Sequence, residues 1–248
     1  MKVKSQTGLF GKLPAHGDFI MRNLPSAFIH AWDEWMQHYI AGTKEQMGEE
    51  WLDIYLTSPI WRFVFSSGVI DENVWAGIML PSVDRVGRYY PFSIAAQLPN
   101  VINPFEFIAM QTLWFESIEN LALLGLNGDI QIDGLVKELD NIELNYTSLY
   151  NNQKATFEQP ALQVNMDFEE QLPVSVYCYM LDPMCQKMFS SYGVWTTSGS
   201  ERINPCMFIS QGLPALKNAP AMMNGNWQEW GWTQPYILNH MGEMRMPA

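Results

Sequence analysis

Cysteine is scarce in this chain, with three residues in 248. Cys178, Cys185 and Cys206 are odd in number, and no two of them form a C-x-x-C pair. A disulfide framework uses an even set of cysteines, and a structural zinc site uses closely spaced Cys and His ligands. The sequence therefore argues against both and predicts reduced, buried thiols.

Positive charge is also scarce. The chain has 14 Lys and Arg residues against 26 Asp and Glu residues, which gives a formal net charge of −12 at pH 7. A surface with this balance repels nucleic-acid phosphates and anionic lipid headgroups. We therefore expect no nucleic-acid partner. The acidic balance suits a protein partner with a basic patch, and it also suits simple solubility.

Long apolar runs are missing as well. None approaches the ~20 residues that a membrane span needs. The first ten residues, MKVKSQTGLF, lack the apolar stretch of a secretory signal. We therefore expect a cytoplasmic protein with no direct membrane insertion.

The signatures of common catalytic and cofactor sites are absent too. Gly8 to Lys12 has the glycines and lysine of a phosphate loop, but Leu13 and Pro14 stand where a P-loop continues into a helix. The four histidines form no HExxH pattern, and no serine lies in GxSxG. We therefore expect no catalytic residues, no cofactor and no metal site.

Apolar and aromatic residues, by contrast, are abundant. Hydrophobic residues make up 48% of the chain, with ten Trp, thirteen Phe and ten Tyr. This composition is sufficient for a large core. We expect a single domain over residues 1–248. Residues 145–170 are polar and weakly patterned, which predicts a loosely ordered connection between a larger N-terminal part and a smaller C-terminal part.

The strand pattern indicates an α+β fold. Short apolar runs bounded by turn residues predict about five strands, at residues 60–65, 74–80, 91–96, 193–197 and 206–211. Residues 7–10 and 19–22 are shorter extended pieces. Because sequential strands with short connections pair antiparallel, we expect an antiparallel sheet flanked by helices.

Helical spacing and capping residues predict the helices. A first helix begins after Pro25 and stops at Gly42, and Thr43 with Gln46 fits a capping box for a second. Asn103 followed by Pro104 predicts the start of another helix with a clear apolar stripe. Residues 174–181 fit either a strand or a helix.

The stretch from residue 74 to residue 96 has apolar runs on both sides of a charged centre. Asp84, Arg85 and Arg88 lie in that centre, between Pro81 and Pro91. One interpretation is that the guanidinium groups meet a carboxylate or phosphorylated residue of a partner. The other is that Arg88 pairs internally with Asp84 or with Asp18 and fixes the loop.

Three sequence blocks resemble the TagF family, also called ImpM, of bacterial type VI secretion. The long central block is GIMLPSVDRVGRYYP at residues 77–91. The others are GLFGKLP at residues 8–14, followed by Gly17-Asp18-Phe19, and WTTSGS at residues 195–200, followed by Gly212-Leu213-Pro214. The family often has two tryptophans where this chain has Val194 and Trp195. No block falls in residues 145–190.

The resemblance implies a cytoplasmic, post-translational repressor of type VI secretion. Its implied partner is the forkhead-associated (FHA) domain protein of the same system, which belongs to a threonine-phosphorylation pathway. The implied core is longin-like, an antiparallel sheet flanked by helices. The leading hypothesis is therefore a non-enzymatic regulator that binds this partner.

Two alternatives remain open at this stage. An enzyme for phosphorylated or acidic substrates would use Asp18, Asp84, Arg85 and Arg88, which would then converge in a pocket. A structural accessory of the secretion baseplate would instead be required for secretion.

Overall fold

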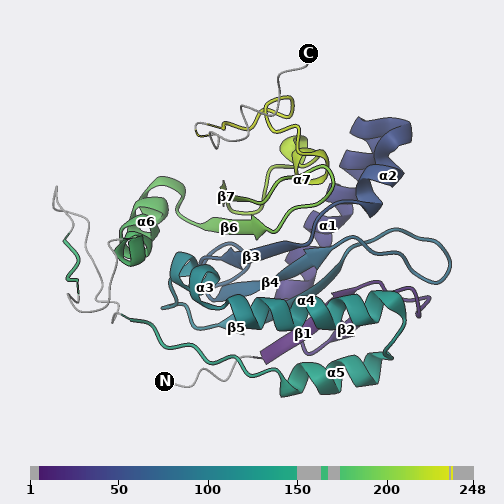
Figure 1. Cartoon of the computed structure of the whole chain (residues 1–248), viewed down its shortest axis with the longest axis horizontal. Helices are drawn as coiled ribbons and strands as arrows, with labels where there is room; N and C mark the ends of the chain where they lie inside the picture. The colour runs from purple at the N-terminus through teal and green to yellow at the C-terminus, as the bar shows by residue number, and fades with distance from the viewer. Residues whose placement is uncertain (1–5, 150–162, 167–173, 235, 237–248) are drawn as a thin grey trace, which may run out of the picture.

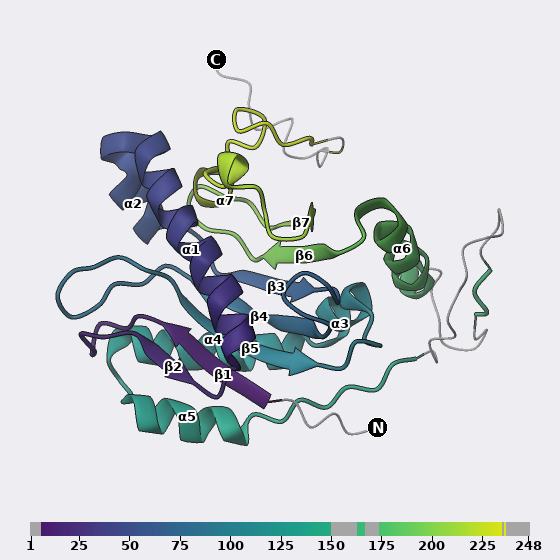
Figure 2. The ribbon, with the colours of Figure 1, turned by 180° about the vertical axis from the view of Figure 1, so that it is seen from behind.

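The computed structural model describes residues 6–149, 163–166, 174–234 and 236. Within these residues, seven strands form one antiparallel sheet in the order β2-β1-β5-β4-β3-β6-β7 (Figures 1 and 2). The strands are β1 (Gln6–Gly11), β2 (Ile20–Arg22), β3 (Trp61–Phe65), β4 (Val74–Leu80), β5 (Phe92–Leu98), β6 (Tyr192–Thr197) and β7 (Cys206–Gln211). The predicted α+β class with an antiparallel sheet is confirmed.

The predicted number of about five strands is too low. The two additional strands are β1 and β2, which correspond to the short extended pieces of the N-terminal segment. β1 pairs along its full length with β5, and β2 pairs with β1 through three residues. A three-residue strand has almost no periodicity of its own, so only its pairing partner identifies it.

Helices cover both faces of the sheet (Figures 1 and 2). One face packs against α1 (Ser26–Met47), α2 (Trp51–Leu56) and α7 (Ala221–Asn224). The other packs against α3 (Pro104–Met110), α4 (Thr112–Asn127), α5 (Ile132–Asn141) and α6 (Val174–Phe189). The central strands are therefore buried on both sides, which is why their sequences are almost continuously apolar.

The two faces have different cores. On the α1 face, aromatic rings from α1 and strands β3, β4, β6 and β7 form one cluster, with Trp32 lying 5.0 Å from Phe63 and 6.3 Å from Trp195 between ring centroids. On the opposite face the strands contribute mainly aliphatic residues, among them Val64 and Ile78. Trp32 and Trp35 of α1 are buried in the first core, and Phe107 of α3 and Trp114 of α4 are buried in the second.

The sequence predicts that the first helix stops at Gly42, and this prediction is wrong. α1 continues to Met47, and Gly48, with φ +61°, ends it. Thr43 does not cap a second helix. Its Oγ1 instead donates to the carbonyl of Tyr39 and accepts a hydrogen bond from Nε1 of Trp51, both in the core. The tertiary contact with Trp51 thus replaces the predicted cap.

Two later helices refine the predictions. Asn103 caps α3, since its side chain accepts hydrogen bonds from the backbone N–H groups of Phe105 and Glu106. The predicted apolar stripe then continues into α4, after a break at Gln111. The ambiguous stretch at residues 174–181 is helical, within α6, and Pro183 lies inside that helix.

The predicted connection at residues 145–170 lies partly outside the described residues. Its first part, residues 145–149, follows α5 and packs against α3 through Tyr146, which is buried. Within the described ranges, no helix combines the length and apolar character that crossing a membrane requires.

Candidate functional site

The loop that joins β4 to β5, residues 81–91, folds back on itself. Val83 and Tyr89 form an isolated antiparallel bridge. At its tip, the backbone N–H of Gly87 donates to the carbonyl of Asp84 at 3.0 Å, and the N–H of Asp84 donates to the carbonyl of Arg88 at 3.0 Å. Gly87 has φ +87°, a conformation that glycine adopts without steric cost. The loop is therefore a small, closed structure.

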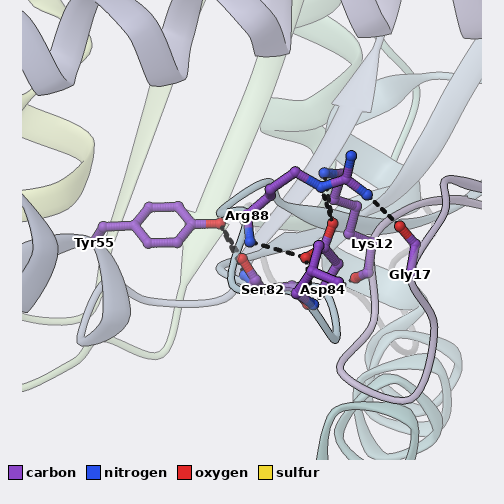
Figure 3. Close-up of polar contacts among 7 residues, drawn as sticks. Lys12, Gly17, Tyr55, Ser82, Asp84 and Arg88 are labelled. Atoms are coloured by element: carbon purple, nitrogen blue, oxygen red, sulfur yellow. Dashed lines mark hydrogen bonds and ion pairs between the residues drawn. The ribbon is translucent and has the colours of Figure 1, made fainter.

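The carboxylate of Asp84 is the centre of this loop (Figure 3). Its Oδ2 accepts hydrogen bonds from Nζ of Lys12 at 2.9 Å and from Nε of Arg88 at 2.6 Å. Its Oδ1 accepts from the backbone N–H groups of Val86 and Arg88 at 3.0 and 2.8 Å. The Asp84 side chain is fully buried, whereas that of Arg88 is 57% exposed.

Opposing effects act on the ionisation of Asp84. Burial raises the pKa of its carboxyl group, but hydrogen bonds from Lys12, Arg88 and Val86 outweigh burial and hold the pKa well below its usual range. Asp84 therefore stays ionised at neutral pH. A general base must exchange protons near the working pH, and this carboxylate does not fit that role.

The loop is fastened to two other segments. Toward the N-terminal segment, the backbone N–H of Arg85 donates to the carbonyl of His16 at 3.0 Å, and Arg88 donates through Nη2 to the carbonyl of Gly17. Toward α2, the hydroxyl of Tyr55 donates to the carbonyl of Ser82 at 2.8 Å and accepts from the N–H of Ser82 at 2.9 Å (Figure 3). Burial raises the pKa of Tyr55. The hydrogen bond with Ser82 lowers the pKa, but by less than burial raises it.

The structure separates the four candidate residues into two groups. Asp84 forms one ion pair with Arg88 and another with Lys12. Asp18 and Arg85 are exposed and take part in no ion pair within the described part of the chain. The ion pair between Asp84 and Arg88 therefore joins only two of the four candidate side chains.

Sequence reasoning missed Lys12 as a partner of Asp84. The two residues are 72 positions apart, so no local pattern connects them. One signal was available in the sequence: Lys12 directly follows an apolar strand and directly precedes Leu13, so it interrupts an apolar run. A charged residue within such a run is buried at a cost unless it is paired.

Sequence reasoning also missed a second buried carboxylate, on the opposite face of the sheet. Glu106, in the first turn of α3, is 2% exposed. It accepts hydrogen bonds from the hydroxyls of Tyr146, Ser148 and Tyr179 and from the backbone N–H of Leu149. Burial, followed by these contacts with Glu106, raises the pKa of Tyr146 and of Tyr179. This cluster joins α3, α6 and residues 146–149.

The geometry of the described residues favours neither a metal site nor a reactive thiol. Among the described residues, no group of three His, Cys, Asp or Glu side chains is arranged to hold a metal ion. The three cysteines are free thiols. Burial raises the pKa of all three, to about 11 for Cys206, so none is an activated thiolate near neutral pH.

Comparison with known families decides what kind of protein this is. A family model for the TagF N-terminal domain, described as type VI secretion system-associated, matches residues 8–142. This match covers more than half of the chain. The chain belongs to the TagF family. The match includes both loops that meet at Asp84, so Lys12, Asp84 and Arg88 all lie within the TagF domain.

A solved structure extends the likeness beyond the matched domain. The crystal structure of PA0076 from Pseudomonas aeruginosa PAO1 is similar to this TagF-family chain with a TM-score of 0.77 and 27% sequence identity. The similarity covers 94% of this chain and 99% of that one. No curated protein sequence matches the chain.

Proposed function

We propose that this chain is a cytoplasmic, non-enzymatic repressor of type VI secretion, which acts after translation by binding the FHA-domain protein of the same system. The observation that carries the proposal is the TagF match over residues 8–142, which places the chain in a family associated with that machinery. The resemblance of the sequence blocks at residues 8–14, 77–91 and 195–200 to the TagF family implies repression as the activity and the FHA-domain protein as the partner.

The site geometry favours binding over catalysis. Both oxygens of Asp84 are occupied by donors from Lys12, Val86 and Arg88, and the carboxylate is buried. Arg88 is held by Asp84 and Gly17. Asp84 therefore offers a substrate neither a free acid nor a free base, whatever role the exposed Asp18 plays.

A deletion strain tests the direction of regulation. Loss of a repressor raises secretion of the system's substrates while leaving the abundance of its structural components unchanged. A baseplate accessory would behave in the opposite way, because its loss abolishes secretion. Reduced secretion in the deletion strain would refute the repressor hypothesis.

Co-purification tests the partner. The tagged chain is expected to retain the FHA-domain protein of the same system from cells that contain it. The experiment is run with the FHA protein in its phosphorylated and unphosphorylated states. Failure to bind in either state would exclude this partner.

A further inference from the structure

Two loops meet at one end of the sheet and present a small exposed surface. The segment between β1 and β2, residues 12–19, lies against the β4–β5 loop at the end where Gly11 pairs with both Ile20 and Phe92 (Figure 1). We call four of the exposed side chains on these two loops, Phe19, Arg85, Val86 and Arg88, the tip patch; Asp18, next to Phe19 in the sequence, is exposed as well. The tip patch lies beside the buried Asp84 ion pair.

The apolar part of the tip patch is held in a fixed position. Phe19 is 43% exposed and Val86 is 66% exposed. The inner side of the Phe19 ring contacts Tyr90, with 4.8 Å between ring centroids, and Nζ of Lys12 lies 4.9 Å from the ring centroid. Exposed apolar and aromatic groups next to arginines are the composition typical of interface cores.

The polar part of the tip patch contains one uncompensated positive charge. The charge of Arg88 is shared with Asp84, but Arg85 has no carboxylate partner within the described residues. The guanidinium of Arg85 lies beside Gly17, with Nη2 3.6 Å from the point that a Cβ on this glycine would occupy. Arg85 is therefore an exposed positive group without a paired carboxylate among the described residues, in a chain whose net charge is −12.

The tip patch is also pre-organised. Backbone hydrogen bonds close the loop at Asp84 and Gly87, and the N–H of Arg85 is fixed on the carbonyl of His16. Binding to a loop that is already ordered avoids most of the entropy cost that a flexible loop would incur. A partner can use this surface without rearranging it.

We propose that the tip patch is the surface through which this chain contacts its protein partner, and that it takes a segment with one Asp or Glu carboxylate beside an apolar side chain. The carboxylate meets the guanidinium fork of Arg85, and the apolar side chain contacts Val86 and Phe19. A carboxylate fits better than a dianionic phosphate because Arg85 supplies one free guanidinium, not two. The proposal deepens the proposed function, on which its choice of protein partner rests.

Charge reversal tests the surface with the FHA-domain protein as the probe. Arg85→Glu is expected to weaken its binding by about tenfold or more, since a charge-assisted contact becomes a repulsive one. Lys217→Glu is the matched control, because it makes the same charge change at an exposed lysine outside the tip. Both variants should keep the wild-type melting temperature. If the wild type and Arg85→Glu bind equally well, the tip patch is not the interface, although the proposed function stands.

A peptide titration tests the surface independently of the FHA protein. Short capped peptides containing Leu-Glu-Leu, Leu-Gln-Leu or Leu-phosphothreonine-Leu are added to the full chain, and backbone amide shifts are recorded by NMR. The Glu peptide is expected to shift residues 17–19 and 85–88 at low salt and less at high salt, whereas the Gln peptide does not. Shifts with the phosphorylated peptide alone, or none at the tip, would overturn the proposal. Tip shifts with the Glu peptide but no FHA binding would reject only the proposed partner.

Discussion

The Nζ atom of Lys12 lies 2.9 Å from Oδ2 of Asp84, and the two side chains are only 5% and 0% exposed. This ion pair joins the segment after β1 to the loop after β4. Arg88 donates to the same carboxylate oxygen from the solvent side. One buried carboxylate thus holds two loops together, and the neighbouring Arg85 bridges them through its backbone N–H, which donates to the carbonyl of His16.

Removing the charge of Asp84 should destabilise the fold. Asp84→Asn leaves the ammonium of Lys12 buried without its counter-ion, and losing one partner of a buried pair costs about 3–5 kcal/mol. The free energy of unfolding is measured by urea denaturation with circular dichroism. The control Asp18→Asn, at an exposed site with no ion pair in the described residues, should change it by no more than about 0.5 kcal/mol. Equal effects of the two substitutions would show that the Asp84 pair does not stabilise the fold.

The same carboxylate predicts a loss of stability in acid. The pKa of Asp84 is lower in the folded than in the unfolded chain, so the unfolded chain takes up the proton first as pH falls. The contribution of Asp84 is complete above the unfolded value of about 4 and is lost as pH falls toward the folded value. The difference in unfolding free energy between wild type and Asp84→Asn should therefore shrink below about pH 4. A difference that stays constant to lower pH would contradict this assignment.

Five buried tyrosines and the half-buried Tyr179 predict a second loss of stability, in base. Burial raises the pKa of six tyrosines well above the ordinary value, namely Tyr39, Tyr55, Tyr90, Tyr146, Tyr179 and Tyr192. Because these folded-state values are raised, their contribution is complete below about pH 10 and is lost as pH rises further. Tyrosinate absorbance should show that these groups ionise only when circular dichroism reports unfolding. Their full ionisation in the folded protein would refute the prediction.

The Glu106 cluster predicts a local effect rather than a global one. Glu106→Gln replaces one acceptor oxygen by an amide donor, so one or more of the four groups that donate to Glu106 lose their acceptor. Leaving a buried donor unsatisfied costs about 1–3 kcal/mol. Amide hydrogen exchange should rise in α6 and at residues 144–149 more than in β4 and β5. Glu138→Gln, an exposed substitution on α5, is the control, and unchanged exchange in α6 would show that Glu106 does not hold it.

Most elements were predictable where local sequence agrees with the fold. β4 and β5 appear as continuous apolar runs because helices cover both faces of the sheet, and Asn103-Pro104 marks the start of α3 by its capping chemistry. Gly42 and Thr43 misled the prediction because the contact of Thr43 with Trp51 outweighs local capping preferences. Residues 174–181 remained ambiguous for a different reason, since a short apolar run fits either a strand or a helix until its neighbours are known.

The sequence by itself determined the fold class, the family resemblance and the loop with Asp84, Arg85 and Arg88 as the segment to study. Apolar periodicity, turn residues and motif spacing are local properties, and they are legible without coordinates. Only the tertiary structure decided which charged and polar side chains meet. Lys12 reaches Asp84 across 72 residues and Tyr179 reaches Glu106 across 73, while Arg85, one residue from Asp84, stays exposed. Pairing in a buried site depends on distance in space and on desolvation, and neither is set by separation along the chain.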